Sequence, residues 1–537
     1  MKYLTLIFGL LFFSVLSADG HLKSEKDVLA SLEKYFEAAK KISRHAVLLP
    51  GGIRFSRYTT RRDWTDEIVQ KIRTFYDLYT ERTRREWMYG DIPVAAEQGQ
   101  IPMAKYIRAT IQYRQQSQTN GPGLDDLAAQ NGLSKKYLQA LWNVFSSQTD
   151  GNSFLLNDLR SRWQSLAPED SEKLAAEIRR WQTSLWKFNS VGHMNQWLEP
   201  VTPLATTENF TVPIVTGNES EKVIVYLAVG DAGDGNVDDF LVWKRPRFEG
   251  NPITEPGKDP RPSDLPPILL ADLPVVITCR GPQRKQQVVF GQHPDNQPLA
   301  DDSFIVQAPA VVEIPVPQEL VGQRQLVVDV ELDTSIGTAG SVQAQVRLEK
   351  MEPTAGIILP VLTNDANPEA NGPPIPGKYP IILQTDQRKQ EFVDAFSAHR
   401  KWFPPAVCYT QIVPVDEGIT ITLFHREDKV LSQFLLEAKE TQQLDQLWHE
   451  LRYVSQDALT IYDSFDDWWN YGAHYGKFSR ESRELPIRQQ AERFQEELRG
   501  SQSQHIDAVL ELAERAYRRP LSVDEKIELL ELYRSLA

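Results

Sequence analysis

Residues 223–243 read VIVYLAVGDAGDGNVDDFLVW, and the fold expected for the middle of the chain follows from this stretch. Residues 223–229 and 240–243 are short runs rich in β-branched and aromatic side chains, which pack well on a pleated surface. Between them, residues 230–239 hold mainly Gly, Asp and Asn, the residue types that turns favour. This order predicts two β-strands joined by a loop.

Similar runs continue on both sides of this stretch. Gly, Pro, Asn and Asp separate them, and no helical period links them. Many short strands of this kind are typical of an antiparallel sandwich. We therefore expect a jelly-roll-like β-sandwich. Its further strands would be residues 210–215, 275–278, 288–290, 311–316, 326–332 and 342–348.

The part of the chain before the β-rich runs predicts helices. Trp64, Ile68 and Ile72 recur at four-residue steps, and Asp63 stands where an N-cap would. Ser134 is the expected cap of a later helix. The apolar stripe of that helix would comprise Tyr137, Leu138, Leu141, Trp142 and Phe145.

The C-terminal part also predicts helices. An apolar face from Leu444 to Trp469 predicts one long amphipathic helix. Ser522 and Glu525 have the spacing of a capping box for the last helix. One hairpin-like pair of runs, within residues 406–424, interrupts the helical pattern.

These patterns together predict an α+β multidomain protein, with helical N-terminal and C-terminal regions around a central antiparallel β-sandwich. A length of 537 residues is too great for one ordinary domain. The expected organisation is a signal peptide over residues 1–18, a helical domain over 19–200, the sandwich over 201–352, a linker over 353–384, and a mainly helical domain with a β-hairpin over 385–537.

The first residues have the pattern of a secretory signal peptide. Lys2 is followed by an apolar run over residues 4–16 and then by the small residues Ser17 and Ala18. The alternative is a membrane anchor that is never cleaved. We expect cleavage, because the apolar run is shorter than the roughly 20 residues that span a bilayer. The mature chain would then be periplasmic or extracellular, with no membrane span.

Charge and cysteine content exclude several classes of function. The formal net charge of −14 argues against binding to nucleic acid, which needs a basic surface. The only cysteines are Cys279 and Cys408, and no Cys-x-x-Cys-His motif occurs, so covalent haem is not expected. In an exported protein the two cysteines can form a disulfide or remain buried thiols, and the sequence leaves both open.

The loop in the opening stretch is the main candidate site. We expect Asp231, Asp234, Asn236, Asp238 and Trp243 to contact a ligand, with the polar side chains binding sugar hydroxyls and Trp243 offering a flat face to a sugar ring. Asp231, Asp234 and Asp238 are also possible oxygen ligands for Ca²⁺. The alternative is a tight turn that needs Gly and Asp for its backbone geometry, with Trp243 in the core.

A second cluster, residues 463–471, alternates acidic and aromatic side chains, as sugar clefts do. Packing explains it equally well, because Phe465 and Trp469 lie on the apolar face of the expected helix. No phosphate-binding loop, Gly-x-Ser-x-Gly elbow or His-Glu-x-x-His motif occurs in the sequence. The sequence therefore identifies no catalytic residue.

Several motifs resemble a family of secreted planctomycete-type proteins. These proteins are built from domains of unknown function and are often linked to cytochrome c-like domains. The matching motifs are RRDWT at residues 61–65, FNSVGH at 188–193, YLAVGDAGDGN at 226–236, WFPPAVCYT at 402–410, LFHRED at 423–428 and RAYRRPL at 515–521. The central strands and their loop also look similar to carbohydrate-binding modules of secreted glycosidases.

These observations lead to one main expectation about function. The chain would be an exported binding and assembly protein of the cell envelope, which recognises a polysaccharide or an envelope partner through its sandwich. One alternative is a polysaccharide-degrading enzyme with unidentified carboxylates. Another is a structural subunit of an envelope complex that contains a separate haem protein.

Overall fold

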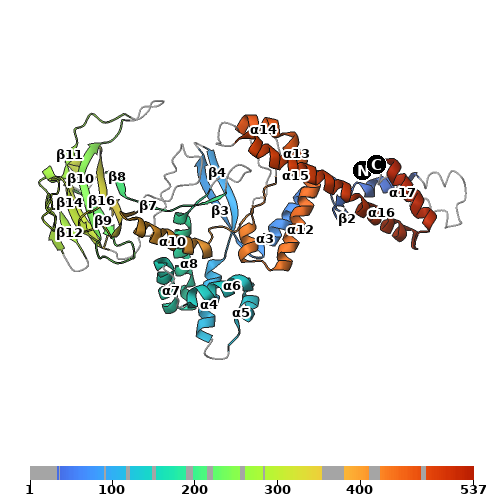
Figure 1. Ribbon diagram of the computed structural model, residues 1–537, viewed down its shortest axis with the longest axis horizontal. Helices are drawn as coiled ribbons and strands as arrows, with labels where there is room; N and C mark the ends of the chain where they lie inside the picture. The colour runs from blue at the N-terminus through green and yellow to red at the C-terminus, as the bar shows by residue number, and fades with distance from the viewer. Residues whose placement is uncertain are drawn as a thin grey trace. The chain divides into compact units, whose positions relative to one another are not determined.

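The structure is a computed structural model, shown in Figure 1. It describes residues 33–34, 37–89, 92–116, 121–147, 153–188, 197–214, 222–253, 261–281, 285–353, 380–410, 424–472 and 479–536. The expected signal peptide lies outside the described residues. Among the described residues, no helix combines the length and apolar character needed to cross a bilayer.

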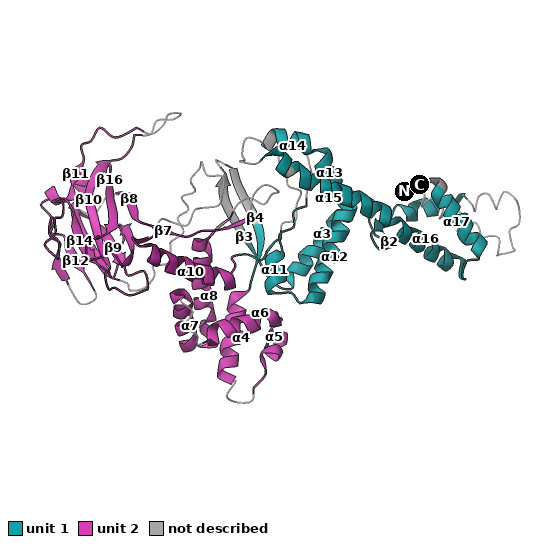
Figure 2. Ribbon diagram, viewed as in Figure 1, with its two compact units in different colours: residues 1–84, 96–101, 406–537 teal, residues 85–95, 102–405 magenta. Residues whose placement is uncertain are grey.

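The chain forms two compact units, which are coloured separately in Figure 2. The first comprises Met1–Arg84, Ala96–Ile101 and Ala406–Ala537, and the second comprises Arg85–Ala95 and Pro102–Pro405. Each unit is therefore discontinuous in sequence.

The first unit is mainly helical. Its N-terminal elements are the hairpin β1 (Ala46–Leu49) and β2 (Gly52–Phe55), followed by α3 (Arg61–Asp77). The C-terminal helices are α11 (Lys429–Phe434), α12 (Ala438–Ser455), α13 (Asp457–Asp463), α14 (Phe465–Gly472), α15 (Arg480–Gly500), α16 (Gln502–Tyr517) and α17 (Val523–Leu536). The capping box before α17 is confirmed, because the Ser522 N–H donates to Glu525 at 2.8 Å and the Glu525 N–H donates to Ser522 Oγ at 3.3 Å.

Two expectations in this unit are corrected. Helix α3 begins three residues earlier than expected, because Thr60 rather than Asp63 is its N-cap. The long helix expected from Leu444 to Trp469 is divided into α12, α13 and α14. The first break falls at Gln456, whose φ of +60° is left-handed and cannot continue an α-helix.

The N-terminal region also contains strands that its composition does not predict. Strands β3 (Glu81–Tyr89) and β4 (Ile92–Gln100) belong to one sheet with β19 (Cys408–Tyr409). Cys408 pairs with Gly99, and Tyr409 pairs with Gln98. The hairpin expected within residues 406–424 lies largely outside the described residues.

The second unit contains a helical part. Its helices are α4 (Met103–Gln116), α5 (Leu124–Asn131), α6 (Lys135–Ser146), α7 (Phe154–Ser165), α8 (Ser171–Leu185) and, after the β-rich part, α10 (Asp386–Trp402); β5 (Trp186–Phe188) and β6 (Leu198–Pro200) form a small hairpin. Ser134 caps α6 as expected, accepting a hydrogen bond from the Tyr137 N–H. Tyr137, Leu138, Leu141 and Phe145 are all buried, so the expected apolar stripe is confirmed there.

The β-rich part of the second unit holds two larger sheets. The five-stranded sheet contains β8 (Thr207–Pro213), β10 (Phe240–Gly250), β11 (Ile268–Leu269), β14 (Phe304–Gln307) and β16 (Arg324–Leu332). The seven-stranded sheet contains β7 (Leu204–Ala205), β9 (Lys222–Gly230), β12 (Thr278–Arg280), β13 (Lys285–Gln287), β15 (Ala310–Pro317), β17 (Ser341–Arg347) and β18 (Ile381–Leu383). Their larger strand pairs are antiparallel, and β18 with β7 is a parallel pair.

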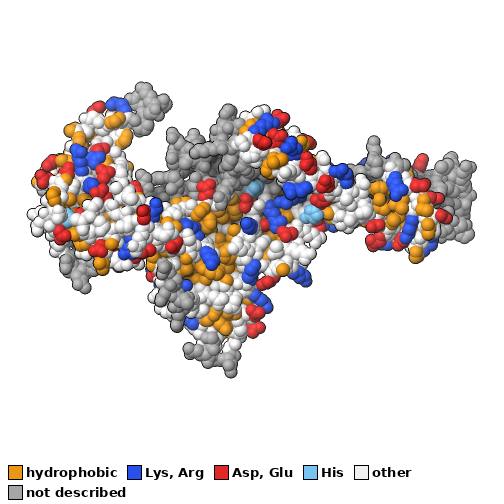
Figure 3. Space-filling view, in the orientation of Figure 1, with side chains coloured by type: hydrophobic (Ala, Val, Ile, Leu, Met, Phe, Trp, Pro, Cys, Tyr) orange, Lys and Arg blue, Asp and Glu red, His pale blue; other side chains and the backbone are white. Residues whose placement is uncertain are grey.

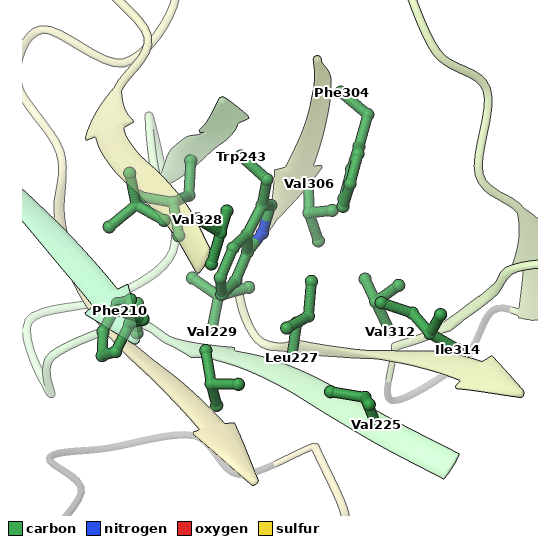
Figure 4. Packing of buried hydrophobic residues seen from close by; sticks show 14 of the residues in the cluster. Phe210, Val225, Leu227, Val229, Trp243, Phe304, Val306, Val312, Ile314 and Val328 are labelled. Atoms are coloured by element: carbon green, nitrogen blue, oxygen red, sulfur yellow. The ribbon is translucent and has the colours of Figure 1, made fainter. Parts of the chain in front are cut away.

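Both sheets contribute side chains to one hydrophobic cluster. From the seven-stranded sheet, Leu227 and Val312 belong to it, and from the five-stranded sheet, Phe210, Trp243 and Val328 do. Figure 4 shows these side chains converging from facing strands. One face of each sheet therefore contributes to this core, and β9 and β17 of the seven-stranded sheet are buried on both faces. Antiparallel sheets with helical regions before and after them in sequence are confirmed.

The strand positions agree only in part with the expected ones. Residues 223–229 and 326–332 lie in β9 and β16, whereas residues 288–290 follow β13 and are not a strand. Strand β18 lies within the range expected to be a linker, and it pairs with β17. Residues 354–379 of that range lie outside the described residues.

Candidate functional site

The loop between β9 and β10, residues 231–239, consists of turns and bends. Ala232, Gly233, Gly235 and Asp238 all have positive φ angles, of 48°, 86°, 106° and 66°. Glycine adopts such angles without steric cost, which accounts for the two glycines of the loop. The loop geometry thus matches the turn interpretation that the sequence left open.

Two acidic side chains of this loop, the half-buried Asp234 and the buried Asp239, contact Ser341. Asp234 accepts a hydrogen bond from the Ser341 hydroxyl and lies 3.3 Å from an Arg388 nitrogen on α10. Asp239 accepts a hydrogen bond from the Ser341 N–H at 2.8 Å. Asp234 Oδ1 and Asp239 Oδ2 are buried without a hydrogen-bond partner. These side chains join the loop to β17 and α10.

Burial controls the ionisation of both carboxyls. It raises the pKa of Asp234, although the Ser341 hydroxyl and Arg388 lower it in part. Burial likewise raises the pKa of Asp239 to about 8, and the neighbouring Asp234 and Asp231 raise it further. A protonated carboxyl can act as a general acid. Asp239 is only 1% exposed, however, so it cannot reach a substrate.

The five expected site residues differ in exposure, although Asp231 and Asp234 lie close enough to interact electrostatically. Asp231 is buried and accepts a hydrogen bond from the Gly233 N–H at 3.1 Å. Asn236 is exposed, and Asp238 is half-buried. Among the described residues, no group of three or more His, Cys, Asp or Glu is arranged to hold a metal. The Ca²⁺ ligands Asp231, Asp234 and Asp238 thus remain a prediction without structural support.

The expected sugar-stacking role of Trp243 is corrected. Its side chain is fully buried in the hydrophobic cluster of the two sheets (Figure 4). Its ring centroid lies 6.4 Å from that of Phe210 and 6.4 Å from that of Phe304. A side chain with no exposed face cannot stack on a ligand, so Trp243 belongs to the core.

The same unit contains a Ser-His-Asp cluster that no sequence motif predicted. His293 Nε2 lies 3.0 Å from Asp333 and 3.1 Å from Ser335 Oγ, while Nδ1 accepts a hydrogen bond from the Asp295 N–H. Because Nδ1 is an acceptor, Nε2 carries the hydrogen, and this N–H donates a hydrogen bond to Asp333. A nucleophilic triad instead places serine and aspartate on opposite nitrogens of the imidazole. This cluster therefore orders its loops and does not activate Ser335.

A polar hollow lies on the outer face of the five-stranded sheet. Its volume is about 430 Å³, within the range of small-molecule sites. Three neighbouring strands line it, β8, β16 and β10. The lining residues are Thr207, Glu208, Asn209, Lys244, Asp329, Val330 and Glu331.

Strand register places the polar side chains of the hollow in rows. Lys244, Asp329 and Asn209 are directly paired across the three strands, and Glu331 is paired with Thr207. Along the strands these positions alternate with Trp243, Val328 and Val330, which belong to the hydrophobic cluster. Successive side chains of a strand point to opposite faces, so the polar side chains lie on the face away from the cluster. The alternation of polar and apolar residues over 209–212 and 329–332 is the sequence signal that could have located this face.

A β-bulge extends this polar face. The register between β10 and β16 shifts between Lys244 and Arg247, and Arg245 has a positive φ of 44°. The extra residue puts Arg247 on the same face as Lys244, because Arg247 pairs with Val327 and Lys244 pairs with Asp329. The sequence alone gives no sign of this shift.

The first unit has its own hollow, of about 490 Å³, beside α3. It is lined by Arg57, Tyr58, Asp63, Asp66, Glu67, Gln70, Lys71 and Thr74. The Glu67 carboxylate has partners within the protein. It accepts a hydrogen bond from the Ser56 hydroxyl at 2.7 Å and forms an ion pair with Lys71 at 3.0 Å. No described contact indicates a ligand there.

The second acidic and aromatic cluster is explained by packing. Phe465 is buried and stacks on Trp469, with 6.2 Å between ring centroids. Arg480 lies over the Phe465 ring and forms an ion pair with Asp466. These contacts join α14 to α15.

Both cysteines are free and buried, Cys279 in the second unit and Cys408 in the first. Burial raises the pKa of Cys279 to about 11 and also raises the pKa of Cys408, whose thiol lies near Asp428. A buried thiol with a raised pKa is a poor nucleophile. The structure thus favours buried thiols over a disulfide.

Comparison with models of known protein families, with curated proteins and with solved structures finds no match for this chain.

Proposed function

We propose that this chain is an exported protein of the cell envelope that binds a polysaccharide through its central β-rich part. The sequence supports export through its signal-like start over residues 1–18. We further propose that the two larger sheets form a jelly-roll-like β-sandwich, which their shared hydrophobic cluster supports.

One observation carries the binding proposal, namely the polar hollow on the outer face of the five-stranded sheet. Its lining offers carboxylates, an amide, a hydroxyl and an ammonium group at fixed strand positions. Sugar hydroxyls both donate and accept hydrogen bonds, so such a mixed lining complements them. The loop of residues 231–239 would then support the sheets, because Asp234 and Asp239 are already bound to Ser341.

Glycan binding by the purified mature chain tests the proposal. The panel of polysaccharides is measured with and without Ca²⁺, beside an Asp329→Ala variant. Asp264→Ala is the matched control, since Asp264 is an exposed aspartate outside the hollow. We expect saturable binding by the wild type and the control, and its loss in the Asp329→Ala variant with its circular dichroism unchanged.

The other outcomes separate the alternatives. Release of new reducing ends would replace the binding proposal by a polysaccharide-degrading enzyme. Absence of glycan binding, with co-purification of a haem-containing protein, would instead indicate a subunit of an envelope complex. Absence of both would leave an envelope partner other than a glycan as the target.

A further inference from the structure

The hydrogen-bonding groups of the hollow are already ordered by one another. The Asn209 amide donates to Asp329 at 2.6 Å, and the Thr211 hydroxyl donates to the Asn209 oxygen at 3.2 Å. The Lys244 ammonium contacts Glu331. A ligand would therefore meet side chains that have already lost much of their rotamer freedom, which reduces the entropy cost of binding.

Each basic side chain of this face has at least one acidic partner. Lys244 pairs with Glu331, and Arg247 lies 2.6 Å from Glu249 and 3.7 Å from Asp329. No cation lining the hollow is left without a described carboxylate partner. Figure 3 shows the same mixture of basic and acidic side chains on the visible surface of the β-rich part.

This pairing makes the hollow unfavourable for an anionic ligand. An anionic ligand would have to displace Asp329 or Glu331 from a cation. The net charge of −14 on the whole chain adds a long-range repulsion. An uncharged ligand breaks no ion pair and is not repelled by the net charge. It can still form hydrogen bonds with the remaining lone pairs and N–H groups of the hollow.

We propose that the hollow binds an uncharged polysaccharide, and that Asn209 and Asp329 are the groups that recognise its hydroxyls. This inference rests on the proposed function. It specifies the class of glycan and the residues that bind it. Asn209 and Asp329 lie on adjacent strands in direct register, so together they present a donor and acceptors side by side. Adjacent hydroxyls of one sugar ring would face such a pair.

Calorimetric titration with three classes of polysaccharide tests the inference. The uncharged class is represented by a mannan and a β-glucan, the anionic class by alginate, and the cationic class by chitosan. We expect saturable binding of an uncharged glycan with less than a twofold change in Kd between low and high salt, because no ion pair is formed.

The variants assign the residues. We expect Asn209→Ala to weaken binding about tenfold, as expected for a lost hydrogen bond, and Asp329→Asn to weaken it to a similar extent. Gln325→Ala is the matched amide control, because Gln325 lies on β16 but does not line the hollow. Thermal unfolding of each variant checks that the fold is retained.

The possible failures are distinguishable. Binding of alginate or chitosan alone would overturn the uncharged class and leave the proposed function standing. Equal affinity of wild type and Asn209→Ala for an uncharged glycan would overturn the assignment of residues. No binding in any class would overturn both the inference and the proposed function.

Discussion

Asp239 and Trp243 are both fully buried in the β-rich part, and each leaves one polar atom without a hydrogen-bond partner. An unpaired buried polar atom costs about 1–3 kcal/mol of stability. For Asp239 the raised pKa reduces this cost, because the carboxyl stays protonated near neutral pH. For Trp243 the apolar contacts of the indole outweigh the lost hydrogen bond. Trp243 therefore stabilises the sheets, and the hydrogen bond from the Ser341 N–H connects Asp239 to β17.

Replacing Trp243 tests this assignment. We expect Trp243→Ala to lower the free energy of unfolding by about 3–5 kcal/mol, because it removes a fully buried aromatic side chain. Urea unfolding followed by circular dichroism measures the change. Trp243→Phe, which retains an aromatic ring, should lose clearly less. A variant that kept its stability and lost only ligand affinity would show that Trp243 belongs to a binding surface.

Among the elements, the local sequence signals work best where the element is stabilised by its own residues. Ser134 and the stripe through Leu138 and Leu141 define α6, since cap and apolar period act within one helix. Strands β3 and β4 carry no such signal. Their pairing involves residues as distant as Cys408, and partners so remote cannot be found from local composition.

The break between α12 and α13 shows the same limit. The apolar period runs through Gln456, so the sequence predicts one helix. In the structure, Asp457 accepts a hydrogen bond from the Phe424 N–H at 2.9 Å. This contact with a distant residue accompanies the left-handed Gln456 and the new helix start. A periodic pattern identifies the buried face but does not show where the backbone turns.

Asp457 also makes this element sensitive to pH. Burial raises the pKa of Asp457 from its usual 3.8 to about 6, more than the hydrogen bonds from Phe424 and Ser455 lower it. The folded state thus retains the proton more strongly than the unfolded state. The stability due to protonated Asp457 should therefore fall as pH rises from about 4 to about 6, by at most about 1.4 kcal/mol per pH unit.

An Asp457→Asn variant isolates this effect. Asparagine keeps a carbonyl oxygen for the Phe424 N–H but does not titrate. We expect the difference in unfolding free energy between the variant and the wild type to grow in favour of the variant from pH 4 to pH 6, and to stay constant above pH 6. A difference that did not vary with pH would show that Asp457 keeps an ordinary pKa in the folded protein.

The candidate site illustrates how much of a surface the sequence can reveal. The loop of residues 231–239 is prominent because its Gly and Asp content is unusual, yet those residues serve turn geometry and buried contacts. The hollow is inconspicuous because its residues come from three separate strands. Only the register brings Asn209 and Asp329 together, and the bulge that adds Arg247 is not encoded by any single residue.

At the scale of the whole molecule, each of the two units has its own buried residues. The second unit contains the cluster around Trp243, and the first contains Trp448, which is 1% exposed and donates to the Tyr76 hydroxyl at 3.1 Å. That hydroxyl in turn donates to Asp428 at 2.7 Å. Units with separate cores can unfold separately, and chains of this size often depart from two-state behaviour.

We therefore expect calorimetry of the mature chain to resolve two unfolding transitions. Trp243→Ala should lower the Tm of one transition by about 5–10 °C, and Trp448→Ala should lower the other by a similar amount, because each substitution leaves a cavity in one core only. An uncharged glycan that binds the hollow should raise only the transition that Trp243→Ala lowers, since a ligand stabilises the part of the chain that binds it. A single transition that both variants lower equally would show that the two units unfold as one cooperative structure.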